Sequence, residues 1–270
     1  MKFTVLMSIY NKETPEHLSQ CLNSIFNQTI QPSEIIIVED GPLNDGLYDE
    51  LTKWESKLPI TRVALQKNSG LGVALNVGLS HCSFKLVARM DTDDICLPDR
   101  FEKQLNVFDN QDVDVCGSWI SEFENEPDLI TAIRTLPESH KDLSSYSKFK
   151  NPINHPSVMF RLDKIVNVGG YEDVRFFEDY YLWLKLLDSG SKFYNIQEPL
   201  VNMRAGVSQL TRRSGLSYAR DEYKFLYKSW NKGFFTFFQF SKCCIFRVPA
   251  RVLPKNILAK IYLLNRNTAF

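Results

Sequence analysis

Three carboxylates lie within four positions of the chain, and this spacing is the first feature that could do chemistry. Asp91, Asp93 and Asp94 stand in the run A-R-M-D-T-D-D-I-C-L-P-D-R at residues 88–100, directly after a predicted buried strand. Carboxylates this close raise one another's pKa unless a cation or hydrogen-bond donors compensate their charge. One explanation is a solvated loop whose Asp side chains cap a turn and the next helix. The other is a site for Mg²⁺ or Mn²⁺, which prefer carboxylate oxygens and substrate phosphates.

The glycine-containing run N-S-G-L-G-V-A-L-N-V-G at residues 68–78 is a second candidate site. A dinucleotide fingerprint needs G-x-G-x-x-G after the first strand, whereas Leu75 replaces the third glycine and this run follows the third predicted strand. The simplest interpretation is a tight turn into a helix. A helix N-terminus near Asn68 and Gly70 would also present backbone N–H groups to an anionic ligand.

Glu178 and Asp179 begin a predicted helix within the aromatic run F-F-E-D-Y-Y-L-W-L-K at residues 176–185. Acidic residues at a helix start commonly complement the helix dipole. The surrounding rings, among them Trp183, could instead desolvate a carboxylate and hold it as a general base. His155 precedes a predicted strand and has no Ser, Cys or Asp partner motif, so it is retained only as a pocket residue.

Predicted strands and helices alternate over the first 118 residues. Apolar runs predict strands at residues 3–9, 34–38, 60–65, 84–89 and 113–117. Apolar residues at helical spacing predict helices at about residues 15–26, 45–57, 70–79 and 98–108. This alternation predicts an α/β fold with a mainly parallel sheet, flanked by helices and connected by right-handed crossovers.

Ligands of such sheets bind beyond the carboxyl ends of the strands. Ser8, Tyr10, Asp40 and the 91–94 cluster all follow strand ends, so we expect them along one rim. After residue 118 the alternation becomes irregular. There we expect strands at residues 119–123, 157–161, 192–196 and 199–204 and helices at residues 178–189 and 215–231. This second part should complete a mixed sheet within the same domain.

The net charge of zero conceals a basic C-terminal segment. No acidic residue follows Glu222, whereas nine of the 32 basic residues do, so residues 1–222 carry 23 basic and 32 acidic side chains. The segment is also aromatic, and it has no apolar run of the roughly 20 residues that a transmembrane helix needs. We expect residues 223–270 to lie on an anionic membrane surface. The alternative is a helix that packs its rings on the main domain and turns Lys and Arg outward.

Other features narrow the class of protein. Six scattered cysteines without a C-x-x-C pair argue against a zinc site or a disulfide framework and favour a reducing cytoplasm. The N-terminal apolar run is too short for a signal peptide and predicts a first strand. The basic residues accompany no recognition motif for nucleic acid, so we expect no nucleic-acid partner.

Taken in order, these runs resemble a family-2 glycosyltransferase of the GT-A fold, of the bacterial type that builds O-antigen, capsule or exopolysaccharide. The resemblance covers about residues 1–205. It rests on V-L-M-S-I-Y-N, I-I-I-V-E-D-G, N-S-G-L-G-V-A-L-N-V-G-L, A-R-M-D-T-D-D-I-C-L-P-D-R-F, N-H-P-S-V-M-F, G-G-Y and E-D-Y-Y-L-W-L-K. Glu39 departs from the family pattern, because many relatives have Asp there, but Asp40 is intact.

The resemblance implies a set of donor contacts and metal ligands. The residues expected at the nucleotide-sugar are Ser8, Tyr10, Asp40, Asn68, Gly70, Asp91, Thr92 and Asp93. Asp40 would accept a hydrogen bond from the uracil imide of a UDP-sugar. Asp93 would be the direct ligand of Mn²⁺ or Mg²⁺, with Asp91 and Asp94 as further metal ligands.

The resemblance also implies an acceptor side. Asp179 would be the catalytic base, and the residues expected at the acceptor are His155, Glu178 and Trp183. Arg100 and Arg204 are expected as phosphate or structural partners. A loop within residues 205–215 would close over the donor and keep water out.

These roles imply an inverting, metal-dependent hexosyltransferase, peripheral at the cytoplasmic face of the cell membrane. It would move a sugar from a UDP-sugar to a glycan acceptor, carried on a membrane lipid diphosphate. Residues 1–118 would bind the nucleotide-sugar, residues 119–222 would bind the acceptor and catalyse, and residues 223–270 would bind the membrane. The alternatives are an inactive scaffold of the same fold that binds nucleotide or glycan, and a sugar nucleotidyltransferase. The run S-I-Y-N-K-E-T lacks the glycine-rich loop that a nucleotidyltransferase needs.

Overall fold

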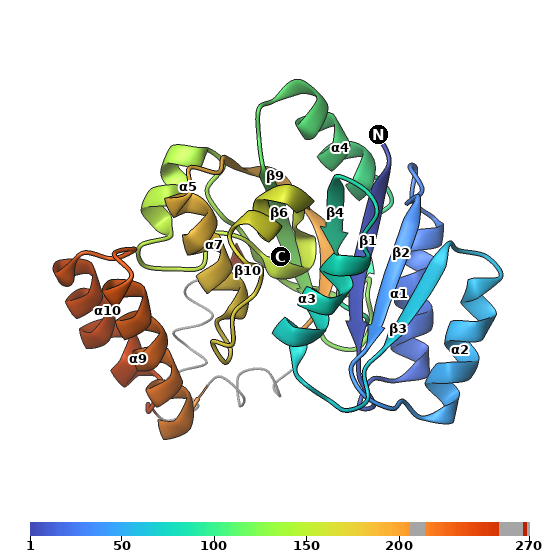
Figure 1. Ribbon diagram of the computed structural model, residues 1–270, viewed down its shortest axis with the longest axis horizontal. Coiled ribbons are helices and arrows are strands. Elements are labelled where there is room, and N and C mark those ends of the chain that lie inside the picture. The colour runs from blue at the N-terminus through green and yellow to red at the C-terminus, as the bar shows by residue number, and fades with distance from the viewer. Residues whose placement is uncertain (206–213, 254–266, 269–270) are drawn as a thin grey trace.

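The strands of the computed structural model form one mixed sheet, and helices cover both of its faces (Figure 1). The structure describes residues 1–205, 214–253 and 267–268. The strands are β1 Phe3–Ile9, β2 Glu34–Glu39, β3 Ile60–Ala64, β4 Leu86–Arg89, β5 Ile95–Cys96, β6 Val115–Phe123, β7 Ile130–Arg134, β8 Met159–Arg161, β9 Phe193–Arg204 and β10 Asn267–Thr268. The helices are α1 Pro15–Phe26, α2 Asp45–Glu55, α3 Leu71–His81, α4 Arg100–Asn110, α5 His140–Tyr146, η1 His155–Ser157, α6 Leu162–Asn167, α7 Glu178–Asp188, α9 Leu216–Asn231 and α10 Phe237–Ala250.

Strands β3, β2, β1 and β4 lie side by side and parallel, so their carboxyl ends meet at one edge of the sheet. Ile9 pairs with Glu39, and Leu6 pairs with Arg89. Strand β8 is antiparallel to both β4 and β6, and β6 continues the sheet parallel to β9. The expected α/β fold with a mixed sheet is confirmed, and so is the common rim of the first strands.

Side-chain alternation along the strands divides the core into two layers. Phe3, Val5 and Met7 of β1 belong to an apolar cluster with residues of α1, α2 and α4, whereas Leu6 belongs to a second cluster with residues of α3 and α7. The first helix begins as expected, because the backbone N–H of His17 donates to the Thr14 hydroxyl at 3.3 Å and Pro15 occupies the first turn. The helices therefore hold the strand ends in fixed register beneath the rim.

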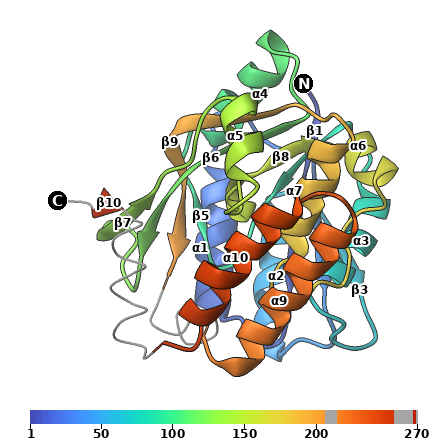
Figure 2. The ribbon, with the colours of Figure 1, turned by 90° about the vertical axis from the view of Figure 1, so that its left-hand side faces the viewer.

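A third apolar cluster joins the C-terminal hairpin of α9 and α10 to the outer side of α7. Figure 2 shows α9 and α10 side by side in front of α7. Phe177 stacks on Phe225 with ring centroids 4.7 Å apart, and Phe235 is buried in the same cluster. Several aromatic rings of residues 223–253 thus pack on the domain, as the alternative interpretation of this segment predicted, while others stay exposed.

Some expected boundaries differ from the structure. One strand, β6, replaces the two expected at residues 113–117 and 119–123, and the bent strand β9 replaces those at 192–196 and 199–204. The short elements β5, β7, α5 and α6 were not predicted. The proposed divisions at residues 118/119 and 222/223 fall inside β6 and α9, so they remain proposals about roles within continuous elements. Most of the loop expected to close over the donor, residues 206–213, lies outside the described residues.

Candidate active site

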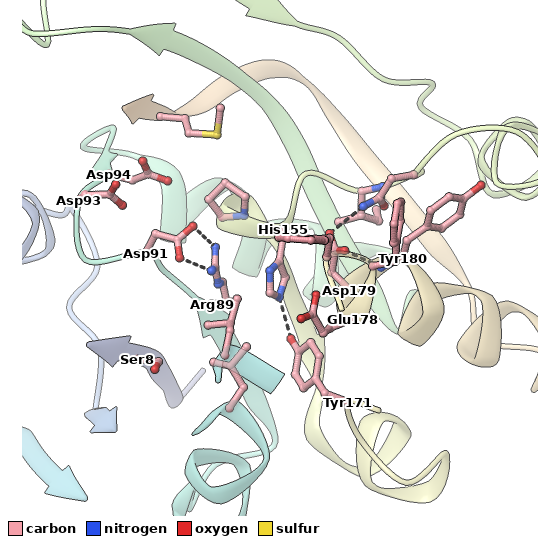
Figure 3. A pocket seen from close by; sticks show the side chains of 18 of the residues that line it. Ser8, Arg89, Asp91, Asp93, Asp94, His155, Tyr171, Glu178, Asp179 and Tyr180 are labelled. Carbon is pink, nitrogen blue, oxygen red and sulfur yellow. Dashed lines mark hydrogen bonds and ion pairs between the residues drawn. The ribbon is translucent and has the colours of Figure 1, made fainter. Parts of the chain in front are cut away.

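A cleft of about 1030 Å³ opens at the carboxyl edge of the parallel strands. Its floor comes from the ends of β1, β2 and β4, and its far wall comes from η1, α7 and the α9–α10 hairpin. The lining includes most of the residues expected at the donor or the acceptor: Ser8, Tyr10, Asp40, Asn68, Gly70, Asp91, Thr92, Asp93, Asp94, His155, Glu178 and Asp179. Figure 3 shows the 91–94 cluster on one side of this cleft and Glu178 and Asp179 on the other.

The three carboxylates that follow β4 have different partners. Asp91 forms a two-pronged ion pair with the buried guanidinium of Arg89, as Figure 3 shows. Asp94 is almost fully buried, and its Oδ1 accepts the backbone N–H of Arg204 at 2.8 Å. One carboxylate oxygen from each of Asp91, Asp93 and Asp94 lies within 4.8 Å of the others. They are therefore close enough to share one cation.

Two carboxyl groups of this cluster have raised pKa values. Burial, followed by the charges of Asp91 and Glu13, raises the pKa of Asp93 to about 7. Burial, followed by the charge of Asp93, also raises the pKa of Asp94 well above its usual value. Thr92 donates a hydrogen bond to Glu13 at 3.1 Å, which brings a further carboxylate to the edge of the cluster.

A divalent cation fits this donor set. The Oδ2 atom of Asp94 is buried and has no hydrogen-bond partner among the residues that the structure describes. An unpartnered buried carboxylate oxygen beside two further carboxylates costs free energy, which a hard cation would offset. Asp93 and Asp94 are the residues best placed to hold it, because Arg89 already compensates Asp91.

Asp40 shapes the donor side of the cleft by fixing the turn that precedes α3. Its Oδ1 accepts the backbone N–H of Ser69 at 2.6 Å, and its Oδ2 accepts that of Gly70 at 3.0 Å. Gly70 has a φ of +92°, in the region that favours glycine. The Asn68 amide adds a hydrogen bond to the Asp40 carbonyl at 3.3 Å. The run at residues 68–78 is therefore a turn into a helix whose start faces the cleft.

The acidic pair at the start of α7 lies in a partly desolvated environment. Asn151 donates to Asp179 Oδ2 at 2.7 Å, and the backbone N–H of Tyr180 donates to Oδ1 at 2.7 Å. Burial, followed by the charge of Asp179, raises the pKa of Glu178 to about 7. Phe176, just before the helix, has a φ of +68°, an uncommon conformation for a non-glycine residue and one typical of functional sites. Two hydrogen bonds therefore hold the Asp179 carboxylate in a fixed orientation, and the pKa of Glu178 lies near neutral pH.

The expectation that Trp183 contacts the acceptor is wrong in this structure. Trp183 is fully buried beneath the cleft and is not among the residues that line it. Its ring lies edge-on to that of His155, with centroids 6.1 Å apart. His155 in turn shares a hydrogen bond of 2.9 Å with the Tyr171 hydroxyl, and burial lowers the pKa of its imidazole well below the usual value. Trp183 therefore packs against the buried side of His155, whose imidazole is neutral.

The two expected arginines have different roles. Arg100 is fully buried, and its Nη2 donates to the Arg89 carbonyl at 2.7 Å, so it is a structural residue and does not reach a phosphate. Arg204 lines the cleft, and its Nε donates to the Asp93 carbonyl at 3.2 Å. Sequence reasoning missed Arg89 as the partner of Asp91 and Asn151 as the partner of Asp179. Neither partner had a signal in the sequence, because Asp91 lies beyond the end of β4 and Asn151 is 28 positions away from Asp179.

Comparison with known proteins identifies the class of this site. The family model described as glycosyl transferase family 2 matches residues 4–169. The chain belongs to glycosyl transferase family 2. It is thus a glycosyltransferase, and the alternative of a sugar nucleotidyltransferase is excluded.

The curated relatives of this chain include named bacterial glycosyltransferases. It is 42% identical over 221 residues to the amylovoran biosynthesis glycosyltransferase AmsE of Erwinia amylovora. That alignment covers 82% of each chain. It is 40% identical over 262 residues to the UDP-Gal:alpha-D-GlcNAc-diphosphoundecaprenol beta-1,3-galactosyltransferase of Escherichia coli, over 97% of this chain and 95% of that protein.

Solved structures share its fold. The S. aureus TarS 1–349 structure in complex with UDP-GlcNAc matches with a TM-score of 0.68 at 18% identity, over 86% of this chain and 67% of that one. The mannosyltransferase PcManGT from Pyrobaculum calidifontis, in complex with GDP-Man and Mn²⁺, matches with a TM-score of 0.65 at 18% identity, over 85% of this chain and 64% of that one. The longer TarS structure is covered over only 38% of its length.

Within residues 1–205, 214–253 and 267–268, no helix is long and apolar enough to cross a bilayer.

Proposed function

We propose that this family member is an inverting, metal-dependent glycosyltransferase that moves a hexose from a UDP-sugar to a lipid-linked glycan acceptor. The observation that carries the proposal is the arrangement of two acidic sites on opposite walls of one cleft (Figure 3). The Asp91–Asp94 cluster suits a cation and a diphosphate, and the pair Glu178–Asp179 suits a hydroxyl group that must lose its proton. Such a separation matches a direct displacement in which donor and acceptor approach from opposite sides.

The donor half of the proposal rests on the rim of β1, β2 and β4. Ser8, the partly exposed ring of Tyr10 and Asp40 lie at adjacent strand ends, where a nucleobase would have a planar surface and a hydrogen-bond acceptor. The turn at Asn68 and Gly70 would complete the wall around the nucleoside. The E. coli relative that is named for a UDP-Gal donor supports a uridine nucleotide, with galactose as the first sugar to test.

The proposed dependence on a metal rests on the suitability of the Asp91–Asp94 cluster as a set of ligands for a divalent cation. A divalent cation bound by Asp93 and Asp94, with Asp91, would offset the charge that develops on the leaving diphosphate. Asp93 and Asp94 would supply the oxygens, while Arg89 keeps Asp91 oriented through its ion pair. The PcManGT structure, which contains Mn²⁺ with its GDP-Man, supports the choice of Mn²⁺ or Mg²⁺.

The chemical step would begin with loss of a proton from the acceptor hydroxyl. Asp179 would accept that proton, with Asn151 and the Tyr180 backbone holding its carboxylate in place. Attack on C1 from the face opposite the diphosphate would invert the anomeric centre. His155 and Glu178 would orient the acceptor sugar at the same wall of the cleft.

The acceptor is proposed to be a sugar on a membrane lipid diphosphate, because the E. coli relative is named for such a substrate and aligns over nearly the whole chain. Peripheral binding to the inner face of an anionic cell membrane through residues 223–270 would bring the cleft to it. The absence of acidic residues after Glu222 and the exposed rings of α10 support this contact.

Release of UDP tests the proposal. Purified protein would be incubated with UDP-galactose, UDP-glucose or UDP-N-acetylglucosamine and a GlcNAc-diphosphate-lipid analogue, with Mn²⁺, with Mg²⁺ or with EDTA. We expect one UDP-sugar to support acceptor-dependent release with a divalent cation and none with EDTA. Binding of UDP-sugar without any transfer in every combination would instead favour the inactive scaffold.

A further inference from the structure

One face of α10 lines the acceptor end of the cleft. At about 100° per residue, Phe246, Arg247, Ala250 and Arg251 fall on one side of this helix, and all four line the cleft. Nothing in the proposed reaction yet uses them. Helix α10 lies beyond α7, on the side away from β1, β2 and β4 (Figure 1).

The two guanidinium groups meet at a single buried carboxylate. Arg247 Nε donates to Glu222 Oε1 at 2.8 Å, and Arg251 Nε donates to Glu222 Oε2 at 2.6 Å. Glu222 is completely buried in α9, whereas both arginines keep part of their side chains exposed. Two positive groups around one negative group leave this trio with a net positive charge that faces the cleft. Arg guanidinium groups in this setting are well suited to a phosphate, because their N–H donors match its oxygens.

This positive wall is directly connected to the candidate base. Arg247 Nη1 donates to the Phe149 carbonyl at 2.9 Å, and Asn151, two residues further along, holds Asp179. Lys150, between them, lines the cleft as well. A ligand whose hydroxyl reached Asp179 would therefore have its next chemical group near Arg247 and Lys150.

An apolar surface continues from the arginines to the outside of the molecule. Phe246 stands at the edge of the cleft with 69% of its surface exposed. The neighbouring side of α10 carries Phe238 and Ile245, which are 84% and 65% exposed. Their spacing of seven residues places them on one stripe of the helix. Exposed apolar groups on such a stripe suit an alkyl chain or the interior of a bilayer.

We propose that Arg247 and Arg251 bind the diphosphate of the lipid-linked acceptor, with its lipid running past Phe246. The order of groups along the wall is carboxylate, guanidinium and apolar ring, which matches the order sugar, diphosphate and lipid in such an acceptor. This inference rests on the proposed function and names the residues that recognise its acceptor. The diphosphate of the donor belongs to the opposite wall, at the acidic cluster, so the two diphosphates do not compete for one site.

Calorimetric binding without donor and with EDTA tests the site independently of transfer. The probe is an α-GlcNAc diphosphate with a short alkyl chain, and its matched ligand is the neutral alkyl glycoside of the same sugar. We expect the wild-type protein to bind the diphosphate at least tenfold more tightly, because the neutral glycoside has no phosphate oxygens to accept charge-assisted hydrogen bonds from the guanidinium groups. Equal affinity for the two ligands would overturn the inference even if UDP-dependent transfer were observed.

Removing an arginine alone would leave the buried carboxylate of Glu222 with less compensation, so the variants that test the site also change Glu222. The double substitution Glu222→Gln with Arg251→Gln removes one guanidinium and the buried carboxylate together, and Glu222→Gln alone is its control. We expect the double variant to lose about tenfold in affinity for the diphosphate and to bind the neutral glycoside within twofold of wild type. Glu222→Gln alone should keep or strengthen diphosphate binding. Equal losses for both ligands would contradict the proposal.

A second control separates the acceptor from membrane headgroups. Lys242→Gln removes an exposed cation from the same helix, and Lys242 does not line the cleft. We expect this variant to leave binding of the soluble diphosphate unchanged. If the Arg251 double variant instead lost sedimentation with phosphatidylglycerol vesicles while its affinity for the soluble diphosphate stayed at the wild-type value, the arginines would serve headgroups and the inference would fail.

Discussion

The Asp94 carboxylate accepts the backbone N–H of Arg204 through Oδ1 at 2.8 Å, which ties the acidic loop after β4 to the end of β9. This bond uses one oxygen of Asp94 and leaves Oδ2 buried, without a hydrogen-bond partner within the described part of the chain. The acidic loop is therefore held in place by a neighbouring strand and still offers an oxygen to a cation.

The three carboxylates should contribute unequally to metal binding. Asp93→Asn should weaken Mn²⁺ binding at least tenfold, because it removes a carboxylate that no cationic side chain pairs with at short range in the described structure. Asp91→Asn should weaken it less, since the Arg89 ion pair already compensates that charge. Titration with Mn²⁺ followed by electron paramagnetic resonance measures both. A larger loss for Asp91→Asn than for Asp93→Asn would contradict the assignment.

Metal-dependent stabilisation should increase with pH. Burial raises the pKa of Asp93 to about 7, above its value of roughly 3.9 in an unfolded chain, so between these values the folded state binds more protons than the unfolded state. The stability of the metal-free protein should then fall as pH rises from about 4 through 7. Mn²⁺ needs the ionised carboxylate, so it should raise Tm more at pH 8 than at pH 5.5.

Thermal unfolding with Mn²⁺ and with EDTA at both pH values measures this effect. Asp93→Asn is the matched control, because it removes the titrating group. Its Tm should respond less to pH, and Mn²⁺ should raise it less. A shift in Tm that is independent of pH in the wild-type protein would count against a cation at Asp93.

Asp179→Asn should lower kcat by about 10²–10⁴-fold, the usual contribution of a positioned general base. Its KM for the donor should change little, because the proposed donor contacts lie on the opposite wall. Asn151→Ala should lower kcat by a smaller factor, since it removes only the hydrogen bond that orients Asp179. Steady-state transfer kinetics measure both variants, and wild-type kcat in Asp179→Asn would show that another group takes the proton.

Protonation of Glu178 should make kcat fall on the acidic side of its pH profile. Its pKa is raised to about 7 by burial and by the charge of Asp179, so it ionises as pH rises through neutrality. The negative charge of Glu178 should favour transfer of the acceptor proton to the wall of the cleft that holds Asp179, so kcat should rise over the same pH interval. In Glu178→Gln this rise should disappear. A profile that is unchanged in the variant would separate Glu178 from the reaction.

Trp183→Phe should affect stability and leave acceptor recognition nearly intact. The side chain is fully buried against His155 and Phe193, so the smaller ring would leave a cavity and cost about 1–3 kcal/mol of unfolding free energy. Denaturant unfolding measures the loss. A change in acceptor KM of more than a few fold at temperatures where the variant is folded would restore the discarded role of this residue.

The order of elements around the rim could be predicted because it depends on local patterns. Runs such as residues 3–9 and 34–38 are mostly apolar and almost entirely buried, and Thr14 with Pro15 marks a helix start. The polar Ser118 interrupts the apolar run of β6, which is why one strand was predicted as two. Short elements such as β5 have too few residues for a periodic signal, and they form because β9 lies beside them.

The site was predictable where residue type and strand position coincide, as for Asp40 and the 91–94 cluster. Contacts between distant segments were not predictable. Asn151 reaches Asp179 across 28 positions, and Glu222 pairs with residues on a different helix. The aromatic run at residues 176–185 contains no sequence signal that tells which ring faces the cleft. The prediction that Trp183 lies at the acceptor therefore differs from the structure, where its ring is fully buried. Packing of whole helices decides such orientations.

The anomeric configuration of the product tests the central claim most directly. Protein, Mn²⁺, UDP-galactose (an α-linked donor) and the GlcNAc-diphosphate-lipid analogue would be incubated, and the new linkage would be read from its anomeric proton coupling by NMR. The account predicts a β-linked product that forms with Mn²⁺ and does not form with EDTA. An α-linked product, or transfer that proceeds equally well in EDTA, would contradict it.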